Sequence, residues 1–432
     1  MNLTSELACD VFVCGGGVAG TIASVAAARH GASVILAERY GFLGGNATAG
    51  AVGQFNSWQT TAGRKVVAGL ANEVVQRLRR YGGAAEHEVF VMSNGHKMDR
   101  VEYSPEVLKL VLDDMVSEAG VQPLLHAQLL GVECKQGQVT SVQMLTKSGV
   151  LKVAPRVLID ASGDLDALRN AGCNFLHLSD GEVLQPGTMM FRFGPVDFER
   201  FDNTPREEIR SLAQHGFEIG ALARAALHAS RNPYSDDAWF NISRLNVDAT
   251  DPLALGKAEI QGRKQAWLAA EFLQAKVPGC EKGRLQAFAT QVGIRETRRV
   301  EGDHILTSQE LMEPALFEDA IAAGAYPIDI HPAQGGNITY KVMGDDHSYQ
   351  IPYRSLIPKN LENAYVVGRG ISADHEALAA IRVMTISMAV GQAAGTAAAM
   401  LCNTIGPALT RSIDVKVLQQ LLLSDGGLIG LS

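Results

Sequence analysis

The chain has 432 residues, 47% of them apolar and 19% charged, and its 44 glycines exceed the usual share of about 7%. This length and composition predict a globular protein of several domain-sized units, and they exclude a disordered chain or a small disulfide-stapled fold. The net charge is −8 and no basic run is longer than two residues, so nucleic acid is not an expected partner.

The six cysteines are scattered without a C-x-x-C pair, which disfavours a metal site, an iron–sulfur cluster or a disulfide framework. A reduced, cytoplasmic setting is therefore expected. Residues 11–28 carry no charge and are long enough for a membrane span or a signal segment. However, Glu6 and Asp10 precede this stretch and three glycines at 15–17 interrupt it. We expect it to belong to the folded protein, with no membrane partner.

The N-terminal region has the pattern of one βαβ unit. Residues 10–14 form an apolar run typical of a strand buried on both faces of a parallel sheet. A glycine-rich turn over 15–20 leads into an alanine-rich helix over 18–30, which Gly31 ends. Residues 33–37 then form a second buried strand.

Further elements follow along the first half of the chain. The spacing of apolar residues predicts amphipathic helices over 65–81 and 105–119, the second capped by Ser104. Short β-like runs between 123 and 153 indicate an antiparallel meander inserted into the α/β layer. Residues 157–160 return to the buried-strand pattern.

The region from 175 to about 350 is richer in aromatic residues and mixes helix and strand signals, which suggests a second, substrate-facing domain. A buried strand over 364–367 and a long alanine-rich segment to Met400 then resume the first pattern. We predict an α/β fold with a three-layer Rossmann-like domain that carries a β-meander insertion, and a discontinuous mixed α+β domain. The predicted ranges are 1–60, 100–180 and 350–432 for the first domain, and 61–99 and 181–349 for the second.

The sequence Gly15-x-Gly17-x-x-Gly20 lies between the first strand and its helix. Glycines at this spacing allow a tight turn, let backbone N–H groups approach a pyrophosphate, and bring helix and strand together. Glu38 ends the next strand, where a carboxylate accepts hydrogen bonds from a ribose. The unit predicts dinucleotide binding, although the motif alone does not choose NAD over FAD.

The residues that follow resemble a more specific fingerprint. Glu38-Arg39 and then Gly44-Gly45-Asn46-Ala47-Thr48 resemble the phosphate-binding motif of the FAD-binding superfamily of glutathione-reductase type. The run from Val157 to Asp164 looks like the second strand motif of that superfamily. The resemblance implies FAD as the cofactor.

The resemblance extends to the FAD-dependent oxidoreductase family. It rests on three segments, Tyr40–Thr48, Gly293–Arg299 and Ile371–Ala377, together with Ile381–Met384 and Gly391–Gly395. Relatives in the succinate dehydrogenase group carry a covalently linked His near the Gly-Gly-Asn segment, whereas this chain has Asn46, Ala47 and Thr48. The resemblance therefore implies noncovalent FAD and leaves the substrate open.

By this resemblance, the residues expected to contact FAD lie on the two glycine loops, at strand ends and at the final strand-to-helix crossing. They are Gly15, Gly17, Val18, Ala19, Gly20, Glu38, Arg39, Gly44, Gly45, Asn46, Ala47, Gln128, Ala161, Ser162, Gly163, Gly368, Asp374 and Arg382.

Two candidate catalytic residues lie where the chain is expected to cross the flavin after the last strand. By a looser likeness to flavoproteins acting on dicarboxylates, His375 is the candidate base or substrate donor, and Arg382 is a clamp for a carboxylate or phosphate. The helix that follows would direct its N-terminus at the flavin. Alternatively, His375 holds a loop together, and Arg382 pairs with Asp374 or the cofactor.

The second domain supplies further candidates. On a β-like stretch, Arg295 and Arg299 share one face and Arg298 takes the other, so Arg295 is the candidate inward-facing anion contact. Pairing of Arg295 with Asp303 or Glu301 is the alternative.

Three further side chains fall near predicted loops of the second domain: Tyr340, Tyr353 and His331. Either tyrosine could place a phenol near a substrate, and Tyr353 is the one selected as a catalytic candidate. Ordinary packing is the alternative for each of the three.

Together these features predict an FAD-dependent oxidoreductase, either a dehydrogenase or an oxidase. It would remove a hydride from a C–H bond of a small polar substrate, anionic or hydroxyl-rich, to flavin N5. The electron acceptor that reoxidises the flavin is unknown, and the apolar tail at 418–423 and 428–431 makes a homodimer possible. The alternatives are a non-redox or structural flavin-binding protein, and an FAD-dependent RNA-modifying enzyme.

Overall fold

A computed structural model describes residues 3–91, 96–331 and 339–430. Its centre is a seven-stranded sheet in the order β6-β2-β1-β9-β8-β7, with β18 also paired to β9. Strands β6 (Gln122–Leu124), β2 (Val34–Ala37), β1 (Leu3–Cys14), β9 (Gly149–Asp160) and β18 (Ala364–Val366) run parallel. Strands β7 (Gln128–Lys135) and β8 (Gln138–Thr146) add antiparallel pairs beyond β9.

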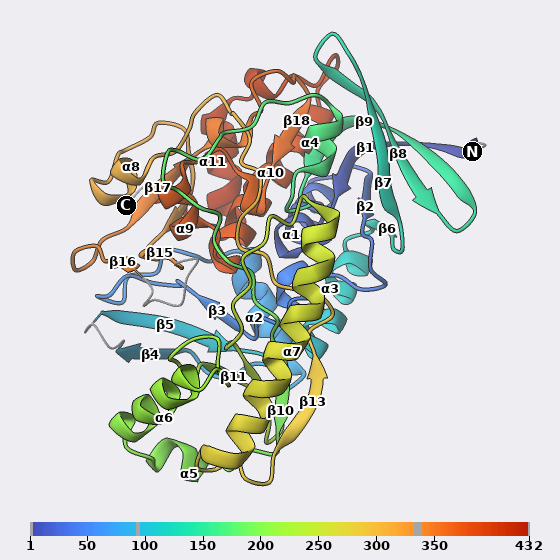
Figure 1. The fold of residues 1–432 in the computed structure, drawn as a ribbon. Coiled ribbons are helices and arrows are strands. Elements are labelled where there is room, and N and C mark those ends of the chain that lie inside the picture. The colour runs from blue at the N-terminus through green and yellow to red at the C-terminus, as the bar shows by residue number, and fades with distance from the viewer. Residues whose placement is uncertain (1–2, 92–95, 332–338, 431–432) are drawn as a thin grey trace.

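Strands β2 and β18 and the C-terminal ends of β1 and β9 are buried on both faces, whereas the edge strand β6 is largely exposed. The buried side chains alternate between two cores. Along β1, Val11 and Val13 enter one core, whereas Phe12 and Cys14 enter the other. Helices α1 (Val18–Arg29), α3 (Pro105–Glu118) and α10 (Met384–Cys402) belong to the first core, while the β7–β8 hairpin and α4 (Asp166–Asn170) belong to the second. The result is the predicted three-layer arrangement (Figure 1).

Helices α1 and α10 pack unusually closely because glycines face backbone across their contact. A Cβ added at Gly391 would lie 2.3 Å from the carbonyl oxygen of Ala19, and one added at Gly395 would lie 2.1 Å from that of Ala23. Helix α10 is long and apolar enough to cross a membrane, but 89% of its apolar window is buried inside the protein, as in a core helix.

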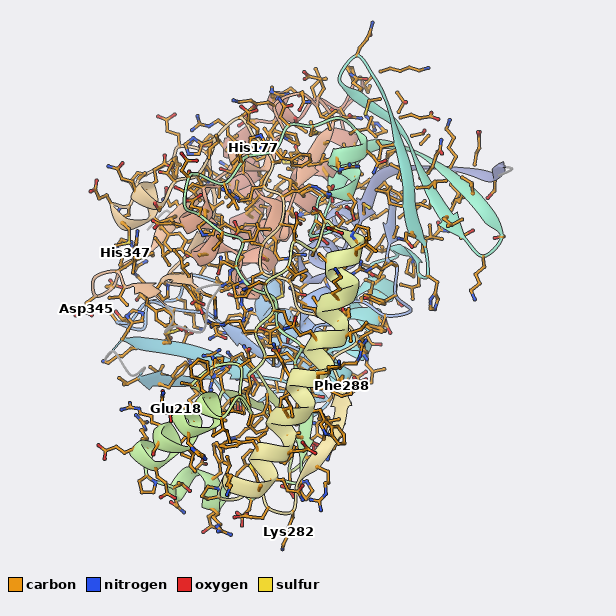
Figure 2. All side chains as sticks on the ribbon, in the orientation of Figure 1. His177, Glu218, Lys282, Phe288, Asp345 and His347 are labelled. Carbon is orange, nitrogen blue, oxygen red and sulfur yellow. The ribbon has the colours of Figure 1, made fainter. Side chains whose placement is uncertain are left out.

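A separate core lies under a four-stranded antiparallel sheet in the order β11-β12-β10-β13. The strands are β11 (Ala229–Arg231), β12 (Ala238–Phe240), β10 (Phe191–Gly194) and β13 (Arg284–Phe288). Phe191, Phe193 and Phe240 fill this core together with the inner face of α7 (Pro252–Lys276). Helix α7 runs along the length of this part, beside α5 (Phe198–Asn203) and α6 (Arg206–Glu218) (Figure 1). Lys282 lies at the end of this part that is farthest from the parallel sheet (Figure 2).

The remaining elements are small antiparallel sheets and further helices. Strands β3 (Gln54–Asn56), β5 (Lys97–Glu102) and β4 (Glu88–Val91) form a small antiparallel sheet. Two antiparallel pairs follow, β14 (Ala320–Gly324) with β17 (Tyr349–Pro352), and β15 (Ile328–Ile330) with β16 (Thr339–Lys341). The other helices are α2 (Leu70–Arg80), α8 (Ser308–Met312), α9 (His375–Ile381) and α11 (Val415–Ser424).

The structure corrects two of the predicted elements. Residues 123–126 are not part of the meander, because β6 pairs in parallel with β2 at the edge of the sheet. The predicted strands 150–153 and 157–160 are one strand, β9, which pairs with β8 at its start and with β18 at its end. A single long strand therefore joins the meander to the parallel sheet.

The predicted domain boundaries also change. Helix α2 lies within 61–99 and strand β14 within 181–349, yet both contribute buried side chains to the core of α1 and α10. Buried residues of the separate core come mainly from 189–294. The C-terminal helix α11 buries Leu418 and Leu422 against its own first core. The second part of the protein is thus smaller than its sequence pattern suggested.

Candidate active site

One large cavity of about 1830 Å³ runs between the parallel sheet and the second part of the protein. Small-molecule pockets typically occupy roughly 300–1,000 Å³, so this cavity has room for an extended ligand and a second molecule. Its walls include the ends of β1, β2 and β9, the N-terminus of α10, and residues of β3, β15 and β16.

Two glycine loops touch each other on one wall of the cavity. The N–H of Gly44 donates to the carbonyl oxygen of Gly16 at 2.7 Å, and a Cβ added at Gly45 would lie 2.9 Å from the Cα of Gly17. Gly17 is also the N-cap of α1, and no side chain caps that helix. The loops therefore present backbone and an uncapped helix N-terminus to the cavity, an arrangement suited to a pyrophosphate.

The carboxylate of Glu38 lies at the end of β2, beside the first glycine loop. Its Oε2 accepts from the N–H of Gly16 at 2.8 Å and its Oε1 from that of Tyr40 at 3.0 Å. Each oxygen keeps a further acceptor position, because a carboxylate offers about four. Glu38 lines the cavity and is thus held ready to accept from a pair of hydroxyl groups.

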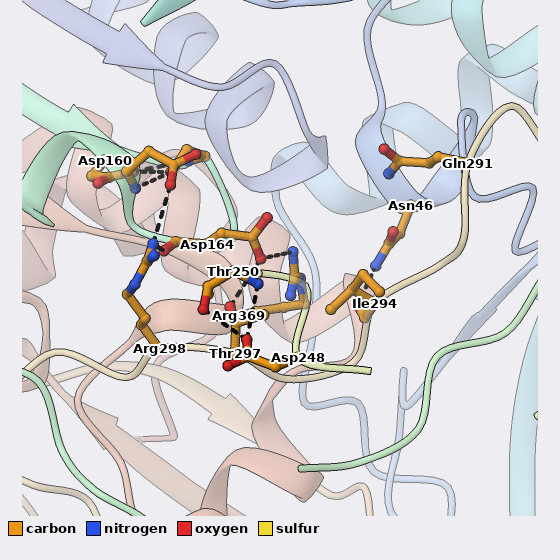
Figure 3. A network of polar contacts seen from close by, with 12 residues as sticks. Asn46, Asp160, Asp164, Asp248, Thr250, Gln291, Ile294, Thr297, Arg298 and Arg369 are labelled. Atoms are coloured by element: carbon orange, nitrogen blue, oxygen red, sulfur yellow. Dashed lines mark hydrogen bonds and ion pairs between the residues drawn. The ribbon is translucent and has the colours of Figure 1, made fainter. Parts of the chain in front are cut away.

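A network of polar contacts fixes the loop that follows β9 (Figure 3). The side chain of Asp164 accepts from Thr297 Oγ1 at 2.9 Å and from Arg369 Nη2 at 3.1 Å, while its backbone carbonyl accepts from Arg298 Nη1 at 2.7 Å. Arg298 therefore holds this loop in place. The amide of Asn46 donates to the carbonyl oxygen of Ile294 at 2.9 Å, which ties the second glycine loop to the same segment.

Arginine side chains gather on another wall of the cavity, and we call Arg224, Arg295 and Arg382 the basic cluster. Arg295 donates to the carbonyl oxygen of Pro186 and, at 2.8 Å, to Thr188 Oγ1. Among the described residues, Arg382 alone of the three has a carboxylate within 4 Å, that of Asp329 at 3.6 Å. Burial lowers the pKa of Arg295, and the charges of the neighbouring arginines lower it further.

The basic cluster faces polar groups on strands β15 and β16. Asp329, His331 and Tyr340 line the cavity, and the Asp329 carboxylate is in contact with both His331 and Arg382. Several buried polar atoms of the cavity wall have no hydrogen-bond partner. They are Arg382 Nε, Asp329 Oδ1, Gln54 Oε1 and Asn241 Oδ1. Such atoms cost free energy unless a ligand or water satisfies them, so this wall is built to hold a polar molecule.

A family model described as FAD dependent oxidoreductase matches residues 10–422. The chain belongs to the FAD-dependent oxidoreductase family. Its cofactor is accordingly FAD, with noncovalent binding as the usual mode. Among curated proteins no sequence matches the chain.

Solved structures are similar to this family member at low identity. The flavin-dependent brominase Bmp2 matches at 12% identity with a TM-score of 0.50, covering 96% of this chain and 83% of that one. L-proline dehydrogenase from P. horikoshii matches at 11% identity and a TM-score of 0.47, covering 98% and 100%. A geranylgeranyl bacteriochlorophyll reductase-like protein from Thermoplasma acidophilum matches at 13% identity with a TM-score of 0.47, covering 98% of this chain and 83% of that one. The brominase likeness supports a shared fold.

The glycine loops, the uncapped α1 and Glu38 together fit FAD, since they offer backbone donors for the diphosphate and an acceptor for the ribose. Of the residues predicted to contact FAD in this oxidoreductase, the cavity is lined by all but two. Those that line it are Gly15, Gly17, Val18, Ala19, Glu38, Arg39, Gly44, Gly45, Asn46, Ala47, Gln128, Ala161, Ser162, Gly163, Gly368 and Arg382.

The two exceptions have structural roles. A Cβ at Gly20 would lie 2.0 Å from the carbonyl oxygen of Gly15, so this glycine brings α1 against β1. The carboxylate of Asp374 caps α9 by accepting from the N–H of Ala377, and it also accepts from that of Ser308. Neither residue is among those that line the cavity.

Two of the predicted catalytic residues, His375 and Tyr353, do not line the cavity. His375 is buried, and its Nδ1 lies 2.9 Å from Glu296 Oε1. This contact fits the alternative in which His375 holds a loop together. Tyr353 is 3% exposed, and its hydroxyl donates to the carbonyl oxygen of Thr410 at 2.8 Å beside the hydroxyl of Tyr365. Tyr340, the other tyrosine considered, does line the cavity.

The predicted strand at 295–299 is absent, and these residues form irregular backbone. Arg295 does line the cavity, but Arg299 lies behind the wall, where its guanidinium donates to the carbonyl oxygen of Ala373 at 3.0 Å. Asp303 and Glu301 pair with Arg411 and Lys359, so the proposed pairing with Arg295 is wrong.

His331 was considered from the sequence with packing as the alternative, whereas Arg224 and Asp329 were not singled out; all three line the cavity. A usable signal for two of them was present, because Ile328, Asp329, Ile330 and His331 alternate apolar and polar residues as a half-buried strand does. For Arg224, which lies outside the named helices and strands, we find no comparable signal.

Proposed function

We propose that this FAD-dependent oxidoreductase oxidises a small anionic substrate by removing a hydride from one of its C–H bonds. FAD, when bound, supplies the two-electron acceptor. The basic cluster binds and orients the substrate, which places the reacting carbon toward the flavin part of the cavity.

The observation that carries this proposal is an excess of positive charge in one wall of the cavity. The three arginines of the basic cluster line the cavity, and within the described part of the chain neither Arg224 nor Arg295 has a carboxylate within 4 Å. A buried charge without a counterion is costly, and guanidinium groups pair with carboxylates and phosphates in bidentate geometry. An anionic ligand would supply the counterion that Arg224 and Arg295 lack.

The N-terminus of α10 supports the same proposal. Val383 is its N-cap without a side-chain cap, and Val383, Met384 and Ser387 line the cavity. A helix N-terminus carries a partial positive charge, which stabilises negative charge that develops nearby during the reaction. We expected a helix after the last strand to direct its N-terminus at the flavin, and α10 is a helix there whose N-terminal residues line the cavity.

Binding of a 2-oxo acid to the holoenzyme, followed through the visible spectrum of the flavin, tests this proposal. The substitution Arg295→Met removes a charge-assisted contact of about 1.5–3 kcal/mol, so we expect roughly 10- to 100-fold weaker binding. The control is Arg200→Met, because Arg200 is exposed and lies outside the cavity. Equal affinity in the wild type and Arg295→Met would contradict an anion site at this arginine.

A further inference from the structure

Strands β15 and β16, together with the residue directly after β15, present three polar side chains to the cavity. Asp329 and Tyr340 are cross-strand partners, and His331 follows Asp329 two residues later, so the three share one face. The opposite face carries Ile328, which is fully buried, and Ile330, which packs against the same core. The packing of the isoleucines therefore fixes which side chains meet the ligand.

Asp329 and His331 form a dyad within this face. His331 Nε2 lies 3.2 Å from Asp329 Oδ2, which also accepts from the hydroxyl of Tyr326 at 3.2 Å. An imidazole nitrogen bound to a carboxylate carries the proton, which leaves Nδ1 as the lone-pair acceptor. Catalytic bases oriented by a carboxylate use this arrangement.

The charges around the dyad favour a neutral imidazole. Burial lowers the pKa of His331 and the charge of Arg295 lowers it further, and this outweighs the opposing effect of Asp329. The pKa of Asp329 is also lowered: burial would raise it, but His331, Arg382 and Arg295 together outweigh burial. At neutral pH the dyad is thus a carboxylate and an uncharged imidazole that can accept a proton.

The same charges discriminate between possible substrates. The basic cluster and the dyad together hold three arginines against one carboxylate, which leaves an excess of positive charge. A zwitterionic amino acid has no net charge and would bring an ammonium group toward arginines. A hydroxy acid brings a negative charge and a neutral hydroxyl group, so it complements this wall better.

We infer that the substrate is a 2-hydroxy acid, whose carboxylate binds the basic cluster and whose hydroxyl group donates to the dyad at His331. This inference rests on the proposed function and names its substrate class.

The reaction balances without a further reactant. The C–H bond at the hydroxyl-bearing carbon breaks, and the hydrogen leaves with both electrons to FAD, which is reduced. The O–H bond breaks and its proton passes to Nδ1 of His331, while the carbon–oxygen bond becomes a carbonyl. The hydroxy acid is thereby oxidised to a 2-oxo acid.

Matched pairs of substrates test the substrate class in the holoenzyme. Anaerobic flavin reduction is measured with 2-hydroxyglutarate and glutamate, malate and aspartate, and lactate and alanine, since each pair differs only in a hydroxyl or an ammonium group. We expect at least one hydroxy acid to reduce the flavin 100-fold faster than its amino partner. Faster reduction by an amino acid, or no reduction by any hydroxy acid, would overturn the inference.

The substitution His331→Asn tests the proton acceptor. We expect flavin reduction by the active hydroxy acid to slow by about 10²- to 10⁴-fold, the usual contribution of a general base. FAD content and the Kd of the corresponding 2-oxo acid should stay within threefold of the wild type. His30→Asn is the matched control, because His30 pairs with Asp425 at the surface. Unchanged reduction in His331→Asn would overturn the role of His331.

Nitrogen-15 NMR of the wild-type imidazoles supplies a readout that does not depend on activity or on a folded variant. It should show His331 neutral at pH 7 with its proton on Nε2, and a charged imidazole there would overturn the inference. If the proposed function itself is wrong, the result differs from a failure of the hydroxy-acid inference alone, because then no 2-oxo acid binds the holoenzyme. If anionic amino acids reduce the flavin, the proposed function stands and only the hydroxy-acid inference fails.

Discussion

The imidazole of His375 and the carboxylate of Glu296 form a buried ion pair behind the cavity wall, with Nδ1 and Oε1 2.9 Å apart. The other oxygen of Glu296 accepts from the backbone N–H of Gln185 at 3.3 Å, and the side chain of Gln185 accepts from Arg382. The pair therefore supports, from behind, the segment that positions an arginine of the basic cluster.

This pair predicts a pH-dependent contribution to stability. Burial alone would lower the pKa of His375, but the hydrogen bond and the charge of Glu296 outweigh it, so the pKa is raised. A raised pKa means that the stabilisation is present below the pKa of unfolded His and is lost as the pH rises through the folded value. Thermal unfolding of wild type and His375→Gln from pH 5 to 9 should show a difference that is largest at the acidic end. A difference that grows toward alkaline pH would contradict this assignment.

Substitution of Glu296 should lower the stability more than substitution of its partner His375. Glu296 is fully buried and faces both His375 and Arg299, so Glu296→Gln leaves the guanidinium of Arg299 without its counterion and removes the charged partner of His375. We expect a loss of about 3–5 kcal/mol in the free energy of unfolding, measured by urea denaturation. Glu133→Gln is the surface control, since Glu133 is exposed and pairs with Lys152. An effect no larger than that of the control would show that the buried pair is not structurally important.

The close contact of α1 and α10 predicts the effect of added side-chain volume. Gly395→Ala places a methyl group 2.1 Å from the carbonyl oxygen of Ala23, so the helices must separate. We expect destabilisation of about 1–3 kcal/mol. Gly256→Ala in α7 is the matched control: no atom lies within 4 Å of the added Cβ, and alanine favours a helix by about 0.5–1 kcal/mol. A stable Gly395→Ala would contradict the observed helix spacing.

Glu38 is expected to contribute to FAD affinity. Glu38→Gln removes the charged acceptor beside the first glycine loop, at a cost of about 1.5–3 kcal/mol, so the Kd for FAD should rise roughly 10- to 100-fold. Titration of the apoprotein with FAD by flavin fluorescence measures this change. Glu86→Gln is the control, because the side chain of Glu86 is 90% exposed. An unchanged Kd would place the ribose elsewhere.

The two tyrosines of the sequence analysis should behave in opposite ways. Tyr353→Phe removes a buried hydroxyl that bonds Thr410, so we expect about 1 kcal/mol lower stability with unchanged catalysis. Tyr340→Phe alters the cavity wall beside Asp329, so we expect changed flavin reduction with little change in stability. Steady-state kinetics and thermal unfolding of both variants check this. Reversed effects would mean that the cavity assignment of the tyrosines is wrong.

The parts of the site that depend on local sequence could be predicted. Gly15, Gly17 and Glu38 lie within one βαβ unit, where spacing alone fixes their positions relative to each other. The same holds for Gly44 and Gly45, which come directly after it.

The parts that depend on tertiary packing could not be predicted in the same way. His375 and Arg382 lie seven residues apart, yet His375 turns into the core beside Glu296 while Arg382 reaches the cavity. The packing of α9, and not the sequence around it, decides that one side chain is buried in the core and the other lines the cavity. Arg224 comes to the same wall from the second part of the protein, and no periodicity in the sequence marks that approach.

The most direct test of an anion-specific flavoenzyme is the anaerobic visible spectrum of the purified protein, recorded during titration with small acids and with their methyl esters. We expect a bound FAD spectrum that at least one acid bleaches and that its uncharged ester does not bleach, because the basic cluster recognises the negative charge. Bleaching by acid and ester alike would show that the basic cluster does not select the substrate, and a protein that binds no FAD would overturn the proposed function as a whole.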